Sequence, residues 1–353
     1  MIMWNKIYKE DMEFIVSCQS VDWNKLRNKT ILVTGGTGLI GSTLINALLH
    51  ANGKKALNLQ VVALVRNISK AQAMFAGNAS LKFVEGTVED LPELNMSIDY
   101  IVHGASPTAS AFFVERPVET IKTAVMGTMN LLELAVKKQV QGFVYLSSME
   151  VYGAPHTDAA IPETQGTTVD TMAVRSCYPE AKRMCESLCA SYASEYQLPA
   201  MAVRLAQTFG PGVAKDDGRV FAEFARCAMH KQDIVLQTAG TSKRCYLYTA
   251  DAVTAILAVL LVGKAGEAYN AANRETYCSI VEMAQLVADK LADKAIKVQV
   301  PTDGKHEQKF SPPHKLNLGT DKLKKLGWKA SRGLVEMYER MIQRDKSNEQ
   351  YSI

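Results

Sequence analysis

One glycine-rich stretch constrains this chain more than any other feature. It runs KTILVTGGTGLIG over residues 29–41, with an apolar strand pattern before the glycines and an apolar helix pattern after them, over 42–49. Glycines at 35, 38 and 41 allow a tight turn, a close approach of the backbone to a ligand, and close packing of the helix on its strand. The free N–H groups of the helix then face an anion.

The spacing of these glycines is GxxGxxG, which an ordinary strand-to-helix turn also shows. Because both flanks are apolar, we interpret the stretch as a site for the pyrophosphate of a dinucleotide. The residues expected to contact the dinucleotide there are Gly35, Thr37, Gly38, Leu39, Ile40 and Gly41.

Further apolar runs follow at 60–65, 81–86, 100–106 and 142–148, and helical patterns separate them, including one over 111–138. Strands that alternate with helices indicate an α/β fold with a doubly wound parallel sheet of the Rossmann type, here with a smaller C-terminal lobe. The expected domains are a helical extension over 1–28, packed on the outside, and a dinucleotide-binding domain over 29–205 with later returns near 244–275. A mainly substrate-binding lobe is expected over 206–345.

In the C-terminal part, the pattern predicts helices over 252–261, from Ser279 to about residue 293, and over 334–344. A short strand is expected at 296–300 and a Pro-rich loop around 312–313. Asp251 is expected to cap the first of these helices or to contact the end of a strand. The polar residues beyond 345 are expected to be loose.

The end of the second strand decides between two dinucleotides. An acidic residue there would bind the ribose hydroxyls of NAD, whereas Arg66 suits the additional phosphate of NADP, with Lys70 one helical turn further on. The alternative is that Arg66 is a solvated strand end. NAD is the expected cofactor and NADP stays open. Ala105 and Ser106 leave room for the cofactor, and His103 is expected to be a packed or hydrogen-bonded core residue.

Composition excludes several classes of function. The 40 basic and 36 acidic residues leave a net charge of only +4, too balanced to indicate a nucleic-acid-binding protein. No apolar run reaches the length of a membrane span, and the first ten residues do not resemble a secretory leader, so we expect a cytoplasmic protein. The seven cysteines form no CxxC motif and no cluster with histidine, so neither a disulfide framework nor a metal site is expected.

The candidate chemistry lies after the strand at 142–148. Ser148 ends that strand, Glu150 follows, and Tyr178 and Lys182 share one face of a helix that begins around residue 179. A free tyrosine has a pKa of about 10, but a neighbouring ammonium favours the phenolate, which makes Tyr178 a usable acid and base. Glu150 is expected to act as a base or to contact the substrate, with a structural carboxylate as the alternative.

Together these segments resemble a family, the extended short-chain dehydrogenase/reductases that modify nucleotide sugars. The resemblance is carried by TGGTGLIG, HGASPTAS, MGTMNLLELA, SSMEVYG, CYPEAKR, TFGPG and KRCYLY. Within the family, the chain is most similar to UDP-glucuronate decarboxylases and next to dTDP-glucose 4,6-dehydratases. The resemblance implies a bound nicotinamide cofactor, and oxidation of the sugar 4-hydroxyl by Tyr178 with Ser148 and Lys182. It also implies a homodimer through a four-helix contact.

The resemblance leaves several reactions open. After oxidation, a uronic acid can lose carbon dioxide, a hexose can be dehydrated, or the 4-hydroxyl can be epimerised. An NADPH-dependent 4-ketoreductase and a non-catalytic dinucleotide sensor are further alternatives. Met149 stands where the dehydratases have an acid and the decarboxylases a hydroxyl, which weighs most against dehydration unless its side chain points away.

Other positions also depart from the family pattern. Gln207 stands in place of an asparagine near the substrate diphosphate, and Thr123 in place of an asparagine near the cofactor. Arg219 and Arg244 match positions that bind the nucleotide diphosphate or the acidic end of the sugar, a role that suits the forked donors of arginine. The expected substrate site thus contains Ser148, Gln207, Arg219 and Arg244, while the base and the sugar stay open.

Overall fold

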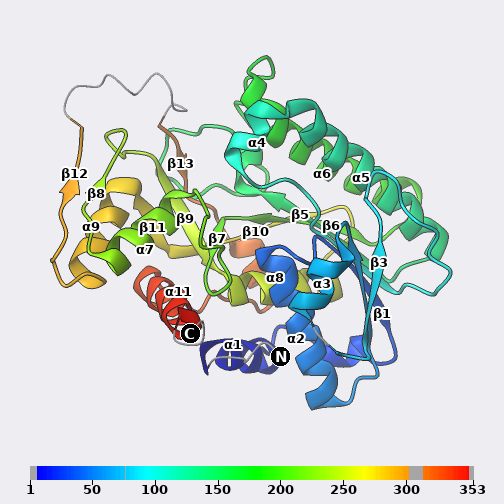
Figure 1. Cartoon of the computed structure of the whole chain (residues 1–353). Helices are drawn as coiled ribbons and strands as arrows, with labels where there is room; N and C mark the ends of the chain where they lie inside the picture. The colour runs from blue at the N-terminus through cyan, green and yellow to red at the C-terminus, as the bar shows by residue number, and fades with distance from the viewer. Residues whose placement is uncertain (1–5, 76, 302–312, 350–353) are drawn as a thin grey trace.

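The computed structural model describes residues 6–75, 77–301 and 313–349, and its centre is a seven-stranded parallel sheet (Figure 1). The order of the strands across the sheet is β10-β6-β5-β4-β1-β2-β3. They are β1 (Thr30–Thr34), β2 (Gln60–Val65), β3 (Leu81–Glu85), β4 (Tyr100–His103), β5 (Gly142–Ser148), β6 (Ala200–Leu205) and β10 (Ala268–Ala271). This arrangement confirms the predicted doubly wound fold.

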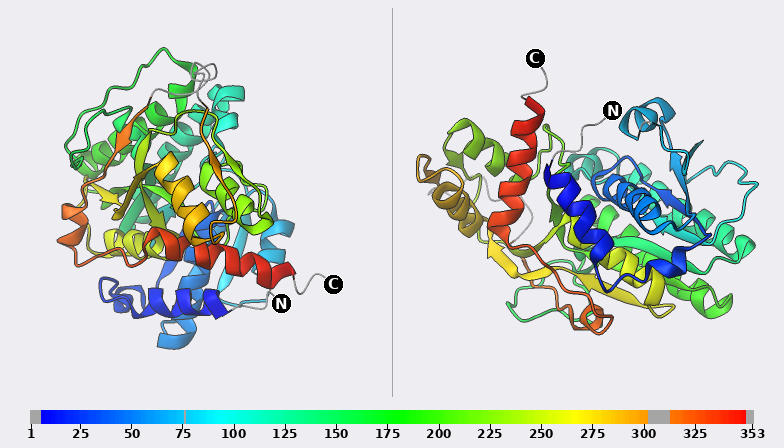
Figure 2. Two further views of the ribbon diagram at one scale, coloured as in Figure 1. Left: turned by 90° about the vertical axis from the view of Figure 1, so that its left-hand side faces the viewer. Right: turned by 90° about the horizontal axis from the view of Figure 1, so that it is seen from below.

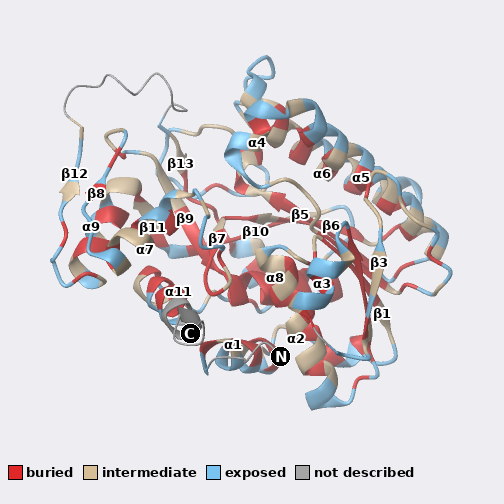
Figure 3. Cartoon of the chain, viewed as in Figure 1, coloured by how far each residue is buried: buried red, intermediate tan, exposed pale blue. Residues whose placement is uncertain are grey.

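Helices cover both faces of this sheet, which explains why its strands are almost continuously apolar (Figures 1 and 3). Leu32 points to the face covered by α5 (Pro117–Lys138) and α6 (Cys177–Glu195), and its neighbour Val33 points to the face covered by α2 (Leu39–Lys55) and α8 (Thr249–Val262). Successive strand residues therefore belong to two different cores.

The helix expected over 111–138 is divided in two. α4 (Ser110–Glu115) ends before Pro117, which occupies the first turn of α5. Proline lacks the N–H that a continuing helix needs but is well suited to the first turn of a new one. The prediction of one continuous helix was therefore wrong, and the break at Arg116 lets α4 fold back toward the end of β5.

The C-terminal lobe has a sheet of its own, in which β9 (Lys243–Tyr248) pairs with β7 (Gln207–Phe209), β11 (Asn273–Ser279) and β13 (Lys315–Leu316). The helices α7 (Val220–His230), α9 (Ile280–Lys290) and α11 (Leu334–Glu349) pack together beside it, whereas α10 (Asp321–Lys324) contacts β10 of the central sheet. The Ser279-led helix is α9, whose capping box joins Ser279 to Glu282. The strand expected at 296–300 is only β12 (Val298–Gln299), which pairs with β8 (Ile234–Val235). Residue 312 of the expected Pro-rich loop lies outside the described residues.

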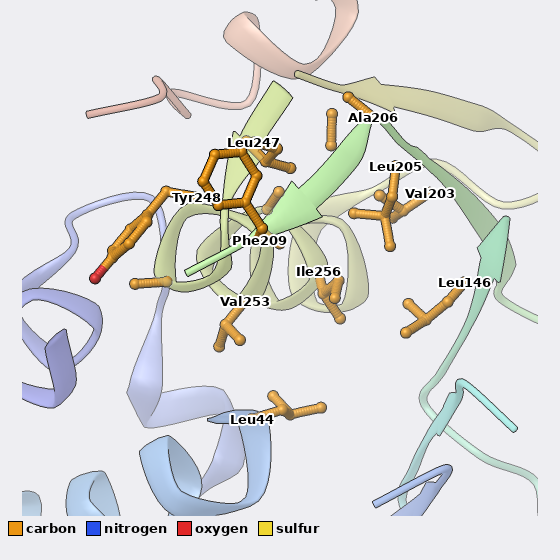
Figure 4. Packing of buried hydrophobic residues seen from close by; sticks show 14 of the residues in the cluster. Leu44, Leu146, Val203, Leu205, Ala206, Phe209, Leu247, Tyr248, Val253 and Ile256 are labelled. Atoms are coloured by element: carbon orange, nitrogen blue, oxygen red, sulfur yellow. The ribbon is translucent and has the colours of Figure 1, made fainter. Parts of the chain in front are cut away.

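The two lobes share one hydrophobic core around α8 (Figure 4). Val253 and Ile256 of this helix lie between Leu44 of α2 and the residues of the sheets, and Phe209 of β7 joins from the second lobe. Phe209 stacks on Phe221 with ring centroids 4.6 Å apart. A substrate-binding lobe anchored in this way is held in place against the dinucleotide-binding sheet.

The N-terminal extension is a helix, α1 (Lys6–Ser17), that packs on α2 and α8 and keeps one face exposed. Its inner face contributes Met12 and Ile15, which are completely buried, to the hydrophobic core. Asp11 accepts hydrogen bonds from Tyr248 at 2.6 Å and from Arg340 of α11 at 2.8 Å. The first and last helices therefore lie side by side (Figure 2). α11 continues to residue 349, beyond the end expected at 344.

Asp251 does not cap a helix, contrary to the first of the two expectations for it. α8 begins at Thr249, and Asp251 lies in its first turn, completely buried. Its carboxylate accepts hydrogen bonds from the backbone N–H of Ser331 at 3.0 Å and from the Ser331 hydroxyl at 2.7 Å. The residue thus ties the segment before α11 to the central helix.

Substitution of Asp251 with asparagine is expected to change how stability depends on pH. Burial raises the pKa of Asp251 to about 6, against about 3.9 in an unfolded chain. The stability contributed by the protonated carboxyl is therefore complete below pH 3.9 and is lost as the pH rises through 6. Between these limits wild type should lose about 3 kcal/mol relative to D251N in urea unfolding, whereas the exposed-site variant D216N should follow wild type. A constant difference between wild type and D251N across this range would contradict the prediction.

Within the described residues, no helix combines the length and the apolar composition that crossing a membrane requires.

Candidate active site

The glycine turn lies at the carboxyl edge of β1. Gly35 has a φ of +72°, and a Cβ atom added to it would lie 2.6 Å from the backbone of Gly104. A Cβ atom added to Gly41 would lie 2.2 Å from the carbonyl oxygen of Gly35. Gly38 is the N-cap of α2 and supplies no side-chain hydrogen bond. The N–H groups of the first helical turn are therefore left for a ligand, as the pyrophosphate site requires.

The end of β4 is held against this turn by Thr34. Its hydroxyl oxygen accepts hydrogen bonds from the N–H groups of Gly104 at 3.2 Å and Ala105 at 3.1 Å. It also lies 2.8 Å from Nδ1 of His103, whose Nε2 lies 3.1 Å from the hydroxyl of Thr128. Burial lowers the pKa of His103 to about 3, so the imidazole is neutral at physiological pH. His103 thus has the hydrogen-bonded core position expected from the sequence.

The remaining predicted cofactor residues differ in exposure. Thr37, Leu39, Ile40, Ala105 and Ser106 are half-buried along this edge. Arg66 follows β2 at the same edge and is exposed, as is Lys70 on α3 (Ile68–Met74). Thr123 stands where the family pattern has an asparagine near the cofactor. In this structure its hydroxyl donates a hydrogen bond to the carboxylate of Glu89.

The structure brings Ser148, Tyr178 and Lys182 together. Lys182 is buried and donates a hydrogen bond to the carbonyl of Leu146 at 2.7 Å, while its Nζ lies 5.6 Å from the centre of the Tyr178 ring. Burial lowers the pKa of Lys182 to about 8. Burial, and next the charge of Glu150, raises the pKa of Tyr178, whereas a hydrogen bond with Ser148 lowers it.

Two residues of this site were missed by sequence reasoning. Arg175, in the short helix η3 (Val174–Ser176), donates hydrogen bonds to both carboxylate oxygens of Glu150, at 3.2 Å and 2.9 Å. Phe113 of α4 stacks on Tyr178 with ring centroids 4.2 Å apart. Neither residue belongs to a periodic pattern. The only available signal was the position of Arg175, three residues before the tyrosine.

Met149 does not line the site. It lies in the short helix η2 (Met149–Tyr152), is 4% exposed, and belongs to the hydrophobic core. The sequence left open whether the Met149 side chain lines the site or points away from it, and in the structure it packs in the core. Position 149 therefore neither supplies nor obstructs a proton donor in this chain.

A polar network fixes η2 from behind. Glu186 of α6 accepts hydrogen bonds from Ser147 at 2.5 Å and from Arg204 at 2.6 Å, and Arg204 in turn donates to the hydroxyl of Tyr152 at 2.8 Å. Glu186, Arg204 and Tyr152 border a cavity of about 450 Å³ whose lining contains neither Ser148 nor Tyr178. The network holds β5, η2, α6 and β6 in one arrangement, which fixes where Ser148 and Glu150 project.

The predicted substrate residues other than Ser148 come from the second lobe. Gln207 is half-buried in β7. Arg219 donates a hydrogen bond to Asp217 at 2.9 Å, and its charge lowers the pKa of Tyr178. One terminal nitrogen of Arg244 lies 3.1 Å from Nε2 of His314. Among the described residues, its buried Nε has no hydrogen-bond partner.

Comparison with known proteins identifies relatives of this chain. The family model described as the NAD dependent epimerase/dehydratase family matches residues 31–272. UDP-glucuronic acid decarboxylase 3 of Arabidopsis thaliana is 31% identical over 276 residues, which are 77% of each chain. UDP-glucuronic acid decarboxylase 6 of the same organism is 32% identical over 267 residues, or 74% of each chain.

Solved structures have the same fold. UDP-glucose 4-epimerase of Thermotoga maritima with UDP-glucose superposes with a TM-score of 0.74 at 24% identity, covering 90% of this chain and 99% of that one. A dTDP-glucose 4,6-dehydratase of Streptomyces venezuelae with NAD bound gives a TM-score of 0.76 at 22% identity, covering 91% and 98%. Together with the family match, the geometry at the carboxyl edge of the sheet leads to one conclusion: the chain belongs to the NAD-dependent epimerase/dehydratase family.

Proposed function

We propose that this protein binds NAD, oxidises the 4-hydroxyl of a nucleotide-linked sugar, and decarboxylates a UDP-linked uronic acid. The observation that carries the proposal is the buried Lys182, fixed by Leu146 beside Tyr178 at the end of β5. The curated relatives named UDP-glucuronic acid decarboxylase support the choice of substrate.

The glycine turn fits the pyrophosphate of NAD. A Cβ atom at Gly35 or Gly41 would fill the cradle, and the first turn of α2 offers its N–H groups. Bound NAD supplies the acceptor for the hydride that leaves carbon 4. The chain itself must then remove one proton from the 4-hydroxyl, hold the sugar in place and keep the charges balanced.

Tyr178 takes the proton of the 4-hydroxyl, with Ser148 as its hydrogen-bond partner and Lys182 as the nearby cation. The oxidised sugar is a β-keto acid, so its carboxylate can leave as carbon dioxide while the electron pair stays on carbon 5 as an enolate. A proton from water then adds to carbon 5. Tyr178 gives its proton back to the 4-oxygen as the ketone is reduced, for which the reduced cofactor would supply the hydride.

The curated relatives favour decarboxylation over dehydration. Loss of the 6-hydroxyl needs an acid to protonate it, and Met149, whose side chain points into the core, counts neither for nor against such an acid. Loss of carbon dioxide from a β-keto acid needs no such acid. Glu150 is held in an ion pair with Arg175, which suits a carboxylate that contacts substrate and stays charged.

The test is incubation of the purified protein with UDP-glucuronate and NAD, followed by mass spectrometry. We expect carbon dioxide and a UDP-pentose. Conversion of a UDP-hexose without formation of a UDP-pentose would reject decarboxylation and indicate an epimerase or a dehydratase instead. Turnover that requires added NADPH and releases NADP would instead support a ketoreductase, the reaction that Arg66 leaves open.

We also propose a cytoplasmic homodimer that assembles through α5 and α6. Val118, Ile121 and Met129 repeat at helical spacing on α5 and are 58%, 44% and 38% exposed, and Met184 on α6 is 52% exposed. Cys185 and Cys189 are buried in the core instead. Light scattering should give twice the mass of the chain, and I121E should shift it toward monomer. A monomeric wild type would contradict this assembly.

A further inference from the structure

The ion pair between Glu150 and Arg175 joins two elements that meet only in the folded chain. Glu150 lies in η2 directly after β5, and Arg175 lies in η3 directly before α6. One terminal nitrogen of the guanidinium, Nη2, donates to both carboxylate oxygens, at 3.2 Å and 2.9 Å, and both side chains are about one-third exposed. A charged donor shared between both oxygens holds the positive charge directly against the carboxylate.

The same guanidinium lies against the tyrosine and its aromatic neighbour. Its central carbon is 4.7 Å from the centre of the Phe113 ring and 5.9 Å from the centre of the Tyr178 ring. Phe113 itself stacks on Tyr178. Arg175 therefore contacts the carboxylate and the two stacked rings at once, and removal of its side chain takes one contact from each.

The charges that face the Tyr178 phenol come from several elements. Burial and then the carboxylate of Glu150 raise the pKa of Tyr178, whereas Arg175 and Arg219 lower it. The Nζ atom of Lys182, on α6, lies 5.6 Å from the centre of the Tyr178 ring. Tyr145 of β5 also interacts electrostatically with Tyr178. Arg219 is already engaged with Asp217. Arg175 is thus the cation that is bound directly to the carboxylate opposing ionisation of the phenol.

We propose that Arg175 is a positioning residue that pins the Glu150 carboxylate and offsets its charge, so that this carboxylate opposes formation of the Tyr178 phenolate less strongly than it would alone. The assignment rests on the proposed function for its role in turnover, since it presumes that Tyr178 removes a proton. It adds that Arg175 acts on the tyrosine mainly through Glu150.

The experiment follows ionisation of the phenol in NAD-loaded protein, so that no sugar substrate is needed. The near-ultraviolet absorbance of phenolate is titrated with pH, and the same titration of a Y178F background isolates Tyr178. R175Q is expected to raise the midpoint by about one pH unit, because a nearby carboxylate loses its counter-charge. E150Q is expected to lower the midpoint. In the E150Q background, R175Q should have less than half of its effect.

Two further variants make the test specific. R175K keeps the charge without the forked donors and should bring the midpoint back toward wild type. R183Q is the matched control. Arg183 forms an ion pair with Glu180 at 3.6 Å on the surface of α6, the helix that carries Tyr178, so this variant should leave the midpoint unchanged.

An unchanged midpoint in R175Q, or an equal shift with and without the Glu150 charge, would overturn the inference. If R175Q does not fold, the titration of E150Q decides the question. A midpoint of Tyr178 ionisation that is not lowered in E150Q also overturns the inference. Failure to form a UDP-pentose while these shifts occur would reject the proposed reaction and leave the role of Arg175 standing.

Discussion

Replacement of Tyr178 with phenylalanine is expected to lower kcat for the nucleotide sugar by about 10²- to 10⁴-fold. The phenol is the group placed to exchange a proton with the 4-hydroxyl, and phenylalanine cannot replace it. The stacking on Phe113 survives, since the aromatic ring is kept. Binding of NAD and the free energy of unfolding should therefore change little.

The control for this variant is Y192F, which removes a hydroxyl from the same helix outside the site. It should retain full activity. The measurement is product formation under saturating substrate, together with calorimetric titration of NAD. Undiminished activity of Y178F would favour the alternative of a dinucleotide sensor that does not turn over.

The second large effect is expected from Gly35→Ala. The new Cβ atom would lie 2.6 Å from the backbone of Gly104 and 2.9 Å from the nitrogen of Ala105, and the φ of +72° is itself unfavourable for alanine. Backbone atoms cannot rotate away as a flexible side chain can. We expect the free energy of unfolding to fall by about 2–4 kcal/mol and NAD to bind more than tenfold more weakly.

Gly53→Ala is the matched control within the following helix. Gly53 is exposed on α2, and an added Cβ atom meets nothing within 4 Å. This substitution should raise the free energy of unfolding by about 0.5–1 kcal/mol, because alanine favours a helix more than glycine does. Urea unfolding and NAD titration of both variants check the prediction, and an unchanged NAD affinity of G35A would contradict it.

The central sheet was predictable because each of its strands is buried on both faces. β2 and β5 have the bounds expected from their apolar runs. The break between α4 and α5 was missed, although Pro117 carries the signal for it, since a proline in an apolar helical pattern marks the first turn of a new helix. The end of α11 was placed at residue 344 because the residues beyond 345 are polar, but the helix continues to residue 349.

The candidate site was predictable in part. Ser148, Tyr178 and Lys182 follow from the position of one strand end and from helical spacing, which are local properties of the sequence. The contact of Glu150 with Arg175 is not local, because two elements must first pack together. The direction of Met149 was equally open, since a short helix after a strand gives no alternation from which to assign a face.

The contact between the two ends of the chain sets the order in which the protein can be completed during synthesis. Asp11 is bound by Arg340, which is separated from it by 329 positions. A ribosome releases the chain from its N-terminus, so the first helix leaves the ribosome long before its partner exists. Until then Asp11 has no guanidinium to offset the cost of its burial. The contact of α1 with α11 can therefore form only after α11 has been made.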